Sequence, residues 1–220
     1  MIDSKEIVNN WDAYAKYISS YFGEGTEAIS NFLKKIVEGK NLNLFGGFEN
    51  YGLNSVEFDA SMYSLKNNNS RNKIQGVYNS NIHLPFKNNS FDSATMVSGW
   101  QYIENTKKFM KELERVLTPG AEFHVINGKN LSFEPFQKRS EDPDYILKEL
   151  EDMSYDCISR EIPSKLDSLI FHDILSQVQQ QHVITCISVA LPKQNKYGFR
   201  RSKIENRLEK ELEHIEYIQK

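Results

Sequence analysis

Strand-like and helix-like segments alternate along most of this chain, and this alternation restricts its fold more than any other feature. After two helical segments at the N-terminus, short apolar runs are separated by stretches with apolar residues at helical spacing. Adjacent parallel strands need long connections, usually helical, whereas antiparallel strands need only tight turns. The pattern therefore predicts an α/β fold with a largely parallel sheet and a last strand that runs antiparallel.

The expected elements follow from periodicity and from turn and capping residues. We expect helices over residues 5–22, 26–38, 105–117, 143–153, 167–180 and 202–219. We expect strands over residues 42–45, 56–59, 74–77, 91–97, 122–126, 155–162 and 182–191. The first domain boundary falls at residues 193–197. This division predicts one domain over residues 1–192, followed by a basic linker and an amphipathic helix over 193–220.

Composition excludes several classes of protein. The chain has 220 residues, 39% hydrophobic side chains and a net charge of −3, so it can build a core and is not disordered as a whole. It has no apolar run of membrane-spanning length, and its N-terminus does not resemble a secretory signal. Cys157 and Cys186 form no CxxC pair and no histidines have metal-ligand spacing, so we expect no metal. The mild negative charge makes nucleic acid an unlikely partner. We expect a cytoplasmic protein that does not insert into membranes.

Residues 84–127 carry the most specific pattern of the chain. They combine a Leu-Pro-Phe loop, a Ser-Phe-Asp strand start and a helix ending in Arg-Val-Leu-Thr-Pro-Gly. The order of these motifs resembles the second half of the class I S-adenosylmethionine-dependent methyltransferase family, in the small-molecule branch known as type 11. The resemblance implies a Rossmann-like class I methyltransferase fold, with N-terminal helices and a C-terminal helix added to it. It also implies S-adenosylmethionine as cofactor and, for an active enzyme, a small-molecule methyl acceptor.

The loop that would bind the methyl donor departs from the family pattern. The family has three glycines after its first strand, often preceded by an acidic residue; here those glycine positions hold Phe45, Gly47 and Glu49, and Asn43 holds the acidic position. Only twelve positions separate Leu44 from Val56, where the next expected strand begins. We therefore expect the helix of this crossover to be missing or reduced to about one turn.

The resemblance nevertheless implies particular site residues. It assigns cofactor binding to Gly46, Gly47, Asp59, Asn79, Ser98 and Gly99, and an acceptor pocket to Trp100 and Tyr102. The family's ribose-binding acid falls on Asp59 or, as a weaker alternative, on Glu57. Asp59 has a structural alternative, which is to cap the helix that begins near residue 61. Trp100 and Tyr102 have one as well, because both rings can pack against the N-terminal helices. No residue stands out as the catalytic base.

The C-terminal segment (residues 193–220) is basic at first and then amphipathic. Its apolar stripe can fold back onto the domain, bind a protein partner or form a homodimer through residues 202–219. Three functions remain open at this point. The chain is an S-adenosylmethionine-dependent methyltransferase with an atypical donor loop, an inactive relative that works as a binding or scaffold subunit, or the same fold with a different chemistry.

Overall fold

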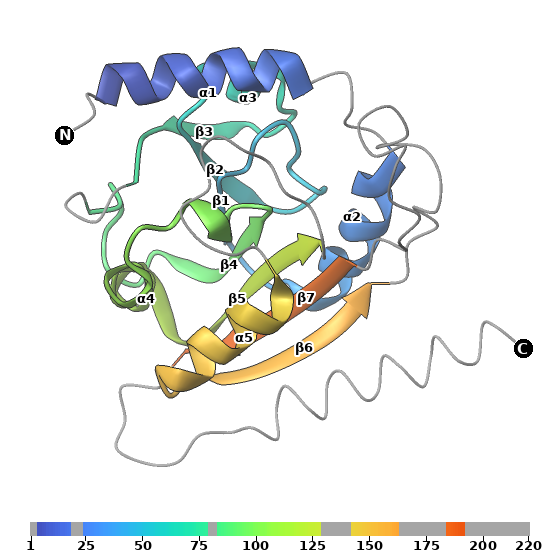
Figure 1. Cartoon of the computed structure of the whole chain (residues 1–220), viewed down its shortest axis with the longest axis vertical. Coiled ribbons are helices and arrows are strands. Elements are labelled where there is room, and N and C mark those ends of the chain that lie inside the picture. Colours follow the sequence, from blue (N-terminus) through green and yellow to red (C-terminus); the bar gives the residue numbers. More distant parts are fainter. Residues whose placement is uncertain (1–3, 19–23, 79–82, 129–141, 163–183, 192–220) are drawn as a thin grey trace, which may run out of the picture.

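In the part of the chain that the computed structural model describes, seven strands form a single sheet (Figure 1). The structure describes residues 4–18, 24–78, 83–128, 142–162 and 184–191. The strands are β1 (Asn41–Leu44), β2 (Ser55–Asp59), β3 (Asn72–Gln75), β4 (Phe91–Val97), β5 (Leu117–Gly128), β6 (Asp156–Ile162) and β7 (Ile184–Ala190). The helices are α1 (Ser4–Ile18), α2 (Glu24–Ile36), α3 (Met62–Asn67), α4 (Thr106–Val116), α5 (Pro143–Asp152) and the short 3-10 helix η2 (Trp100–Tyr102).

The order of the strands confirms the predicted α/β class. It is β3-β2-β1-β4-β5-β7-β6, with parallel pairing from β3 through β5. β7 is antiparallel to both of its neighbours, β5 and β6. The sheet is therefore mostly parallel with one late antiparallel strand, as the sequence predicts for a Rossmann-like class I methyltransferase fold.

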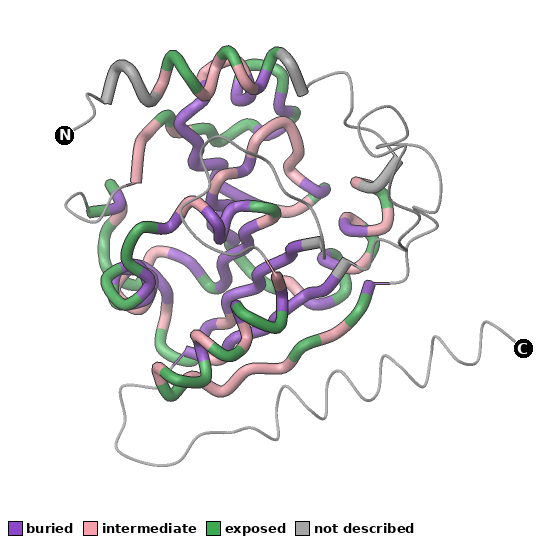
Figure 2. The backbone as a smooth tube through the Cα atoms, in the orientation of Figure 1, coloured by how far each residue is buried: buried purple, intermediate pink, exposed green. Residues whose placement is uncertain are grey.

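Two hydrophobic clusters lie on opposite faces of the sheet. Figure 2 shows that the central strands are mostly buried. The larger cluster includes side chains of α4 and α5, and the rings of Trp100, Phe109 and Phe123 are fully buried in it. The smaller cluster lies under α2 and joins Leu33 and Ile36 to Ile126 of β5. Successive residues of a strand point to opposite faces, so β5 contributes Phe123 and Val125 to the larger cluster and Ile126 to the smaller one.

The connection between β1 and β2 contains no helix. Residues 45–54 form turns, and the two strands still pair in parallel with Asn43 opposite Glu57. The side chain of Ser30 on α2 donates a hydrogen bond to the carbonyl of Tyr51 at 2.8 Å. The predicted loss of the crossover helix is confirmed, and α2 contacts the loop that remains.

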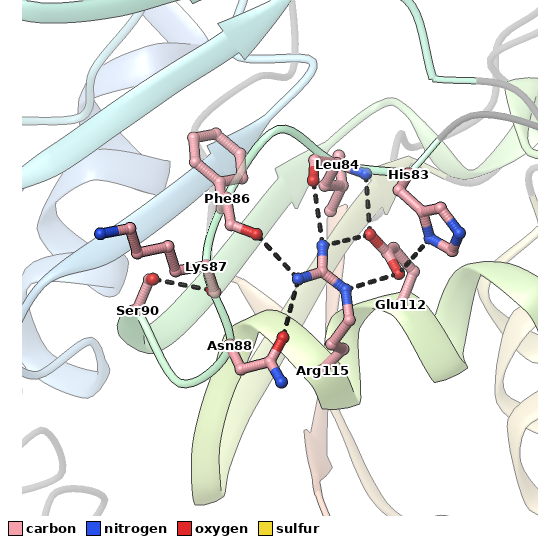
Figure 3. A network of polar contacts seen from close by, with 8 residues as sticks. All are labelled: His83, Leu84, Phe86, Lys87, Asn88, Ser90, Glu112 and Arg115. Atoms are coloured by element: carbon pink, nitrogen blue, oxygen red, sulfur yellow. Dashed lines mark hydrogen bonds and ion pairs between the residues drawn. The ribbon is translucent and has the colours of Figure 1, made fainter.

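Two charged side chains of α4 hold the Leu-Pro-Phe loop (Figure 3). Arg115 donates to the carbonyls of Leu84 and Phe86 at 3.0 and 2.7 Å, and Glu112 accepts the Leu84 amide at 2.8 Å. Arg115 also pairs with Glu112 through two of its nitrogens. These contacts explain why arginine and glutamate occur three residues apart in the motif, since together they fix the loop that leads into β4.

Some expectations concern residues that the structure does not describe. They are the helices over 167–180 and 202–219, and with them the division of the chain at residue 193. Within the described residues, no helix has the length and apolar character needed to cross a membrane.

Candidate functional site

The candidate site lies at the edge of the sheet where β1, β2 and β4 end. Ligands of open α/β sheets bind outside the carboxyl ends of the strands. α1 contacts this edge: Asp12 accepts hydrogen bonds from the Ser61 hydroxyl at 2.7 Å and from the Tyr63 amide at 2.9 Å, at the start of α3. Trp11 of α1 also meets the ring of Tyr102 edge-on, with 4.7 Å between ring centroids. Figure 1 shows α1 and α3 side by side.

The loop after β1 keeps the backbone conformation of a glycine loop although it lacks two of the glycines. Phe45 and Gly47 both have φ of 55°, in the left-handed region that favours glycine. The ring of Phe45 turns toward the end of β4, where a Cβ on Gly99 would lie only 2.6 Å from it. Phe45 therefore follows the backbone path of the glycine that it replaces and fills space next to Gly99.

The two glycines of this loop have different surroundings. A Cβ added to Gly46 would come within 2.4 Å of a carboxylate oxygen of Glu57. A Cβ added to Gly47 would meet one described atom within 4 Å, the carbonyl oxygen of Phe45 at 3.9 Å. Gly46 is thus required by packing within the protein. Gly47 instead borders open space among the described residues, while its N–H is bonded to Asp59 and its carbonyl to the Asn68 side chain.

Asp59 connects this loop to the start of α3. One carboxylate oxygen accepts the Gly47 amide at 2.9 Å and the other accepts the Ser61 amide at 2.7 Å. Asp59 as a residue is 9% exposed, and the pKa of its carboxyl is raised because burial outweighs the lowering effect of these backbone hydrogen bonds. The cap of α3 is Ser61, whose hydroxyl accepts the Ser64 amide. The expectation that Asp59 caps the helix is therefore wrong: Ser61 is the cap, and Asp59 accepts the amide of the capping residue.

Glu57 is fully buried within β2 and does not reach the edge of the sheet. It accepts a hydrogen bond from the Asn43 amide group at 2.6 Å and another from the Ser55 hydroxyl. Burial raises the pKa of Glu57 to about 7, against the opposing effect of the Ser55 and Asn43 hydrogen bonds. Asp59, and not this weaker alternative, is therefore the acidic residue that the structure places at the site.

A row of buried polar side chains continues from Glu57 across the sheet. The Thr95 hydroxyl donates to Asn43 at 3.0 Å and accepts from the Asn41 amide group at 2.9 Å, and Ser93 donates to Asn41 at 3.1 Å. From the sequence, Glu57 is only the weaker alternative for the ribose-binding acid, and no role is predicted for this row. The signal was present, because polar residues alternate with Leu42 and Leu44 along β1.

The remaining predicted residues lie in three different surroundings. Ser98 has φ of 52° and together with Gly99 forms the turn after β4. Tyr102 is half-buried against α1. Trp100 is fully buried against Phe109 and Phe123, and its indole nitrogen donates to Glu149 at 3.2 Å. Trp100 is therefore part of the core on the α5 side and packs neither in an acceptor pocket nor on the N-terminal helices. Asn79 lies outside the described residues.

No described histidine or cysteine provides a base or nucleophile at this edge. His83 contacts Glu112 at 3.0 Å near the start of β4, and His124 contacts Ser188 at 3.0 Å inside the sheet. Burial raises the pKa of both Cys157 and Cys186 to about 12, so both thiols are protonated at neutral pH. The described residues also contain no group of side chains that could hold a metal ion.

A hollow of about 530 Å³ lies beside the Leu-Pro-Phe loop, away from the candidate site. Its lining residues are His83, Leu84, Pro85, Phe86, Lys87 and Arg115. The guanidinium of Arg115 donates all its hydrogen bonds to neighbouring protein groups, so this hollow offers no free arginine to an anion.

The described residues fit a nucleoside cofactor at two points. The backbone of Gly47 borders open space, and a buried carboxylate, that of Asp59, lies next to it. A carboxylate at the end of the second strand is the group that binds ribose hydroxyls in Rossmann-like folds. Phe45 does not prevent this fit, because its ring points toward Gly99 and not across Gly47.

Comparisons with known proteins agree with this geometry. A family model described as a methyltransferase domain matches residues 38–125. A demethylmenaquinone methyltransferase of Renibacterium salmoninarum is 32% identical over 100 residues, which cover 45% of this chain and 41% of that protein. A 2-phytyl-1,4-naphtoquinone methyltransferase of Nostoc sp. is 31% identical over 96 residues, which cover 39% of this chain and 41% of that protein. The chain thus spans about two fifths of the length of these relatives.

Solved structures with the same fold cover more of the chain. An S-adenosylmethionine-dependent methyltransferase of Thermotoga maritima has a TM-score of 0.57 and 16% identity, over 82% of this chain and 99% of that chain. A chain from a complex with the Trm112 methyltransferase activator of Haloferax volcanii has a TM-score of 0.61 and 15% identity, over 89% of this chain and all of that chain.

The sheet order, the loop after β1 and the carboxylate after β2 define a Rossmann-like methyltransferase domain. Over the matched segment, residues 38–125, the chain is similar to the class I S-adenosylmethionine-dependent methyltransferase family.

Proposed function

We propose that this protein binds S-adenosylmethionine at the edge formed by β1, β2 and β4 and transfers its methyl group to a small molecule. The observation that carries the proposal is the pair formed by Asp59 and Gly47, a buried carboxylate beside a glycine that borders open space. Asp59 is the residue for the ribose hydroxyls. Gly46, Gly47, Ser98 and Gly99 supply the backbone around the donor, and Asn79 remains part of the assigned set.

The protein's own contribution is positioning. S-adenosylmethionine, when bound, supplies an activated methyl group on a sulfonium. The loop of residues 45–54 and the turn at Ser98 and Gly99 orient the donor. α1, which packs on Tyr102, limits the access of water to the site. Aligning two reactants in this way supplies a large part of the rate enhancement without a catalytic base. This agrees with the absence of a histidine at this edge among the described residues.

The acceptor in this proposal is a small molecule with an apolar ring. The two relatives described above are named as methyltransferases of demethylmenaquinone and of 2-phytyl-1,4-naphtoquinone. The rings of Trp11 and Tyr102 meet at this edge, and an aromatic surface suits a flat apolar acceptor. Tyr102 is the acceptor-side residue in this proposal, and Trp100 is no longer included.

The proposal also includes a cytoplasmic location and a protein partner. Free thiols at Cys157 and Cys186 support a reducing compartment. The structural neighbour that comes from a complex with an activator protein supports a partner. Residues 202–219, with their apolar stripe, are the segment that we assign to such a partner or to a second copy of the chain.

Isothermal titration calorimetry with S-adenosylmethionine and S-adenosylhomocysteine tests the proposal. We expect binding by the wild-type protein and an affinity loss of roughly ten- to a hundredfold in Asp59→Ala, because a charge-assisted hydrogen bond to ribose is removed. Asp144→Ala, which changes an exposed acid on α5, is the matched control and should bind normally. Absence of binding by the wild-type protein would refute the proposal and favour the inactive scaffold alternative.

A further inference from the structure

Asn43 and Glu57 occupy directly opposed positions on adjacent parallel strands. Both side chains are fully buried, and the Asn43 amide nitrogen lies 2.6 Å from a carboxylate oxygen of Glu57. Asn43 stands where the family often has an acidic residue. The carboxylate on this part of the sheet therefore comes from the neighbouring strand, β2.

The same amide group reaches the loop after β1. The Asn43 amide nitrogen also donates to the carbonyl of Glu49 at 3.1 Å. The Asn43 side-chain oxygen accepts from Thr95 at 3.0 Å, which fixes the orientation of the amide. With its oxygen bound to Thr95, Asn43 must direct both N–H groups toward Glu57 and the loop.

Glu57 also bears on the loop through packing. Its carboxylate occupies the space that any side chain at position 46 would need, 2.4 Å from the Cβ that residue 46 lacks. Gly46 follows Phe45, whose amide donates to the carbonyl of Phe58 at 2.7 Å. The start of the loop is therefore held by a hydrogen bond to β2 and by packing against Glu57.

We propose that Glu57 is a positioning residue for residues 45–54: acting through Asn43, it fixes the loop backbone that the methyl donor contacts. The loop contains no helix that could hold its shape. The buried pair of Asn43 and Glu57 in the sheet supports the loop backbone instead. The role in donor binding depends on the proposed function above, whereas the role in holding the loop does not.

The ionisable groups around Glu57 make its action dependent on pH. Asp59 on the same strand raises the pKa of Glu57, and Glu57 in turn raises that of Tyr51 in the loop. Glu49 is linked to it through its carbonyl and Asn43. The Ser55 hydroxyl and the side chains of Asn43 and Asn68 favour the ionised form. Glu57 therefore changes its charge close to neutral pH, where loop order is easily measured.

Amide hydrogen exchange on the full-length, ligand-free protein tests this inference. Glu57→Gln removes a charged acceptor, and we expect exchange of the Gly47, Glu49 and Leu53 amides to accelerate roughly tenfold at pH 8. In an Asn43→Ala background the same change should accelerate these amides by less than about twofold, because the residue that transmits the effect is gone.

Two further measurements separate positioning from a general loss of stability. Glu112→Gln removes a different buried carboxylate, on α4, and should leave exchange of the loop amides unchanged. In the wild-type protein, loop exchange corrected for intrinsic rates should change between pH 6 and pH 8, and this change should vanish in Glu57→Gln. Equal acceleration in both backgrounds, or no acceleration at all, would overturn the inference.

Calorimetry with S-adenosylhomocysteine then tests the link to the donor. We expect Glu57→Gln to weaken this affinity about tenfold while the Glu112→Gln control binds normally. If the wild-type protein does not bind the ligand, the proposed function fails and the exchange data still decide the role of Glu57 in the loop. Unchanged affinity in Glu57→Gln beside wild-type binding would overturn the role of Glu57 in donor binding.

Discussion

Glu57 is a carboxyl group removed from water inside a β-sheet, and this has a thermodynamic consequence. Its pKa is raised from 4.5 to about 7, mainly by burial. The folded protein therefore holds a proton on Glu57 between these two values where the unfolded chain has released it. The contribution of Glu57 to stability is fully present below pH 4.5 and is lost as pH rises toward 7.

We predict that replacing Glu57 by glutamine removes this pH dependence. Between pH 5 and pH 8 the wild-type free energy of unfolding should fall by roughly 3 kcal/mol through Glu57 alone. In Glu57→Gln the decline should be much smaller over the same window. Urea denaturation at several pH values measures both curves, and parallel curves would show that Glu57 titrates near its ordinary pKa.

Phe45 allows a second prediction, on ligand affinity. Phe45→Gly places glycine at a position with left-handed backbone, which removes the strain of a bulky residue there. It also removes the ring beside Gly99. We expect S-adenosylhomocysteine affinity to rise several-fold and the free energy of unfolding to fall by about 1–2 kcal/mol, since a half-buried ring is lost. Calorimetry and chemical denaturation measure the two effects. Weaker binding would mean that the ring itself forms part of the donor site.

The position of Asp59 at the end of a strand was predictable from sequence, because period and turn residues locate strand ends. The role of Glu57 was not predictable, because it depends on the register that places Asn43 opposite it. Trp100 shows the same limit: an aromatic residue after a strand can face the site or the core. Here the ring of Trp100 packs in the core against Phe109 and Phe123.

At the scale of elements, α4 stabilises the Leu-Pro-Phe loop as well as itself. Burial alone would raise the pKa of Glu112. Hydrogen bonds from Arg115, His83 and the Leu84 amide outweigh this effect and lower the pKa. Lysine at position 115 would keep the charge but lose the planar group that bonds two carbonyls and a carboxylate at once.

We therefore predict that Arg115→Lys lowers the free energy of unfolding by about 1–3 kcal/mol. Chemical denaturation measures the loss. Lys107→Met, on the exposed side of the same helix, is the matched control and should change stability by less than about 0.5 kcal/mol. A loss no larger than that of the control would show that the loop is held by its own turns.

Most elements were predictable because each has a clear hydrophobic period. α4 has its buried residues at helical spacing, and β4 extends over the seven residues expected. The loss of the helix after β1 was predictable from chain length alone. The packing of α2 against the loop was not, because it depends on a contact between Ser30 and the carbonyl of Tyr51, which no local pattern encodes.

At the scale of the whole molecule, the C-terminal segment provides a prediction from sequence alone. Residues 193–220 lie outside the described part of the chain, and the stripe of Ile204, Leu208, Leu212 and Ile215 is long for a helix free in water. We expect a protein ending at Pro192 to melt at a lower temperature or to change its oligomeric state. Differential scanning calorimetry and light scattering on both lengths check this, and identical results would show that the segment is dispensable.

The short connection between β1 and β2 also bears on how the chain folds. Asn43 and Glu57 are 14 residues apart, whereas the partners of β1 on β4, such as Thr95, lie 52 residues away. Closing the longer loop costs about 1 kcal/mol more chain entropy than closing the shorter one. We therefore expect β1 to pair with β2 earlier in folding than with β4, because the short connection without a helix makes this strand pair local in sequence.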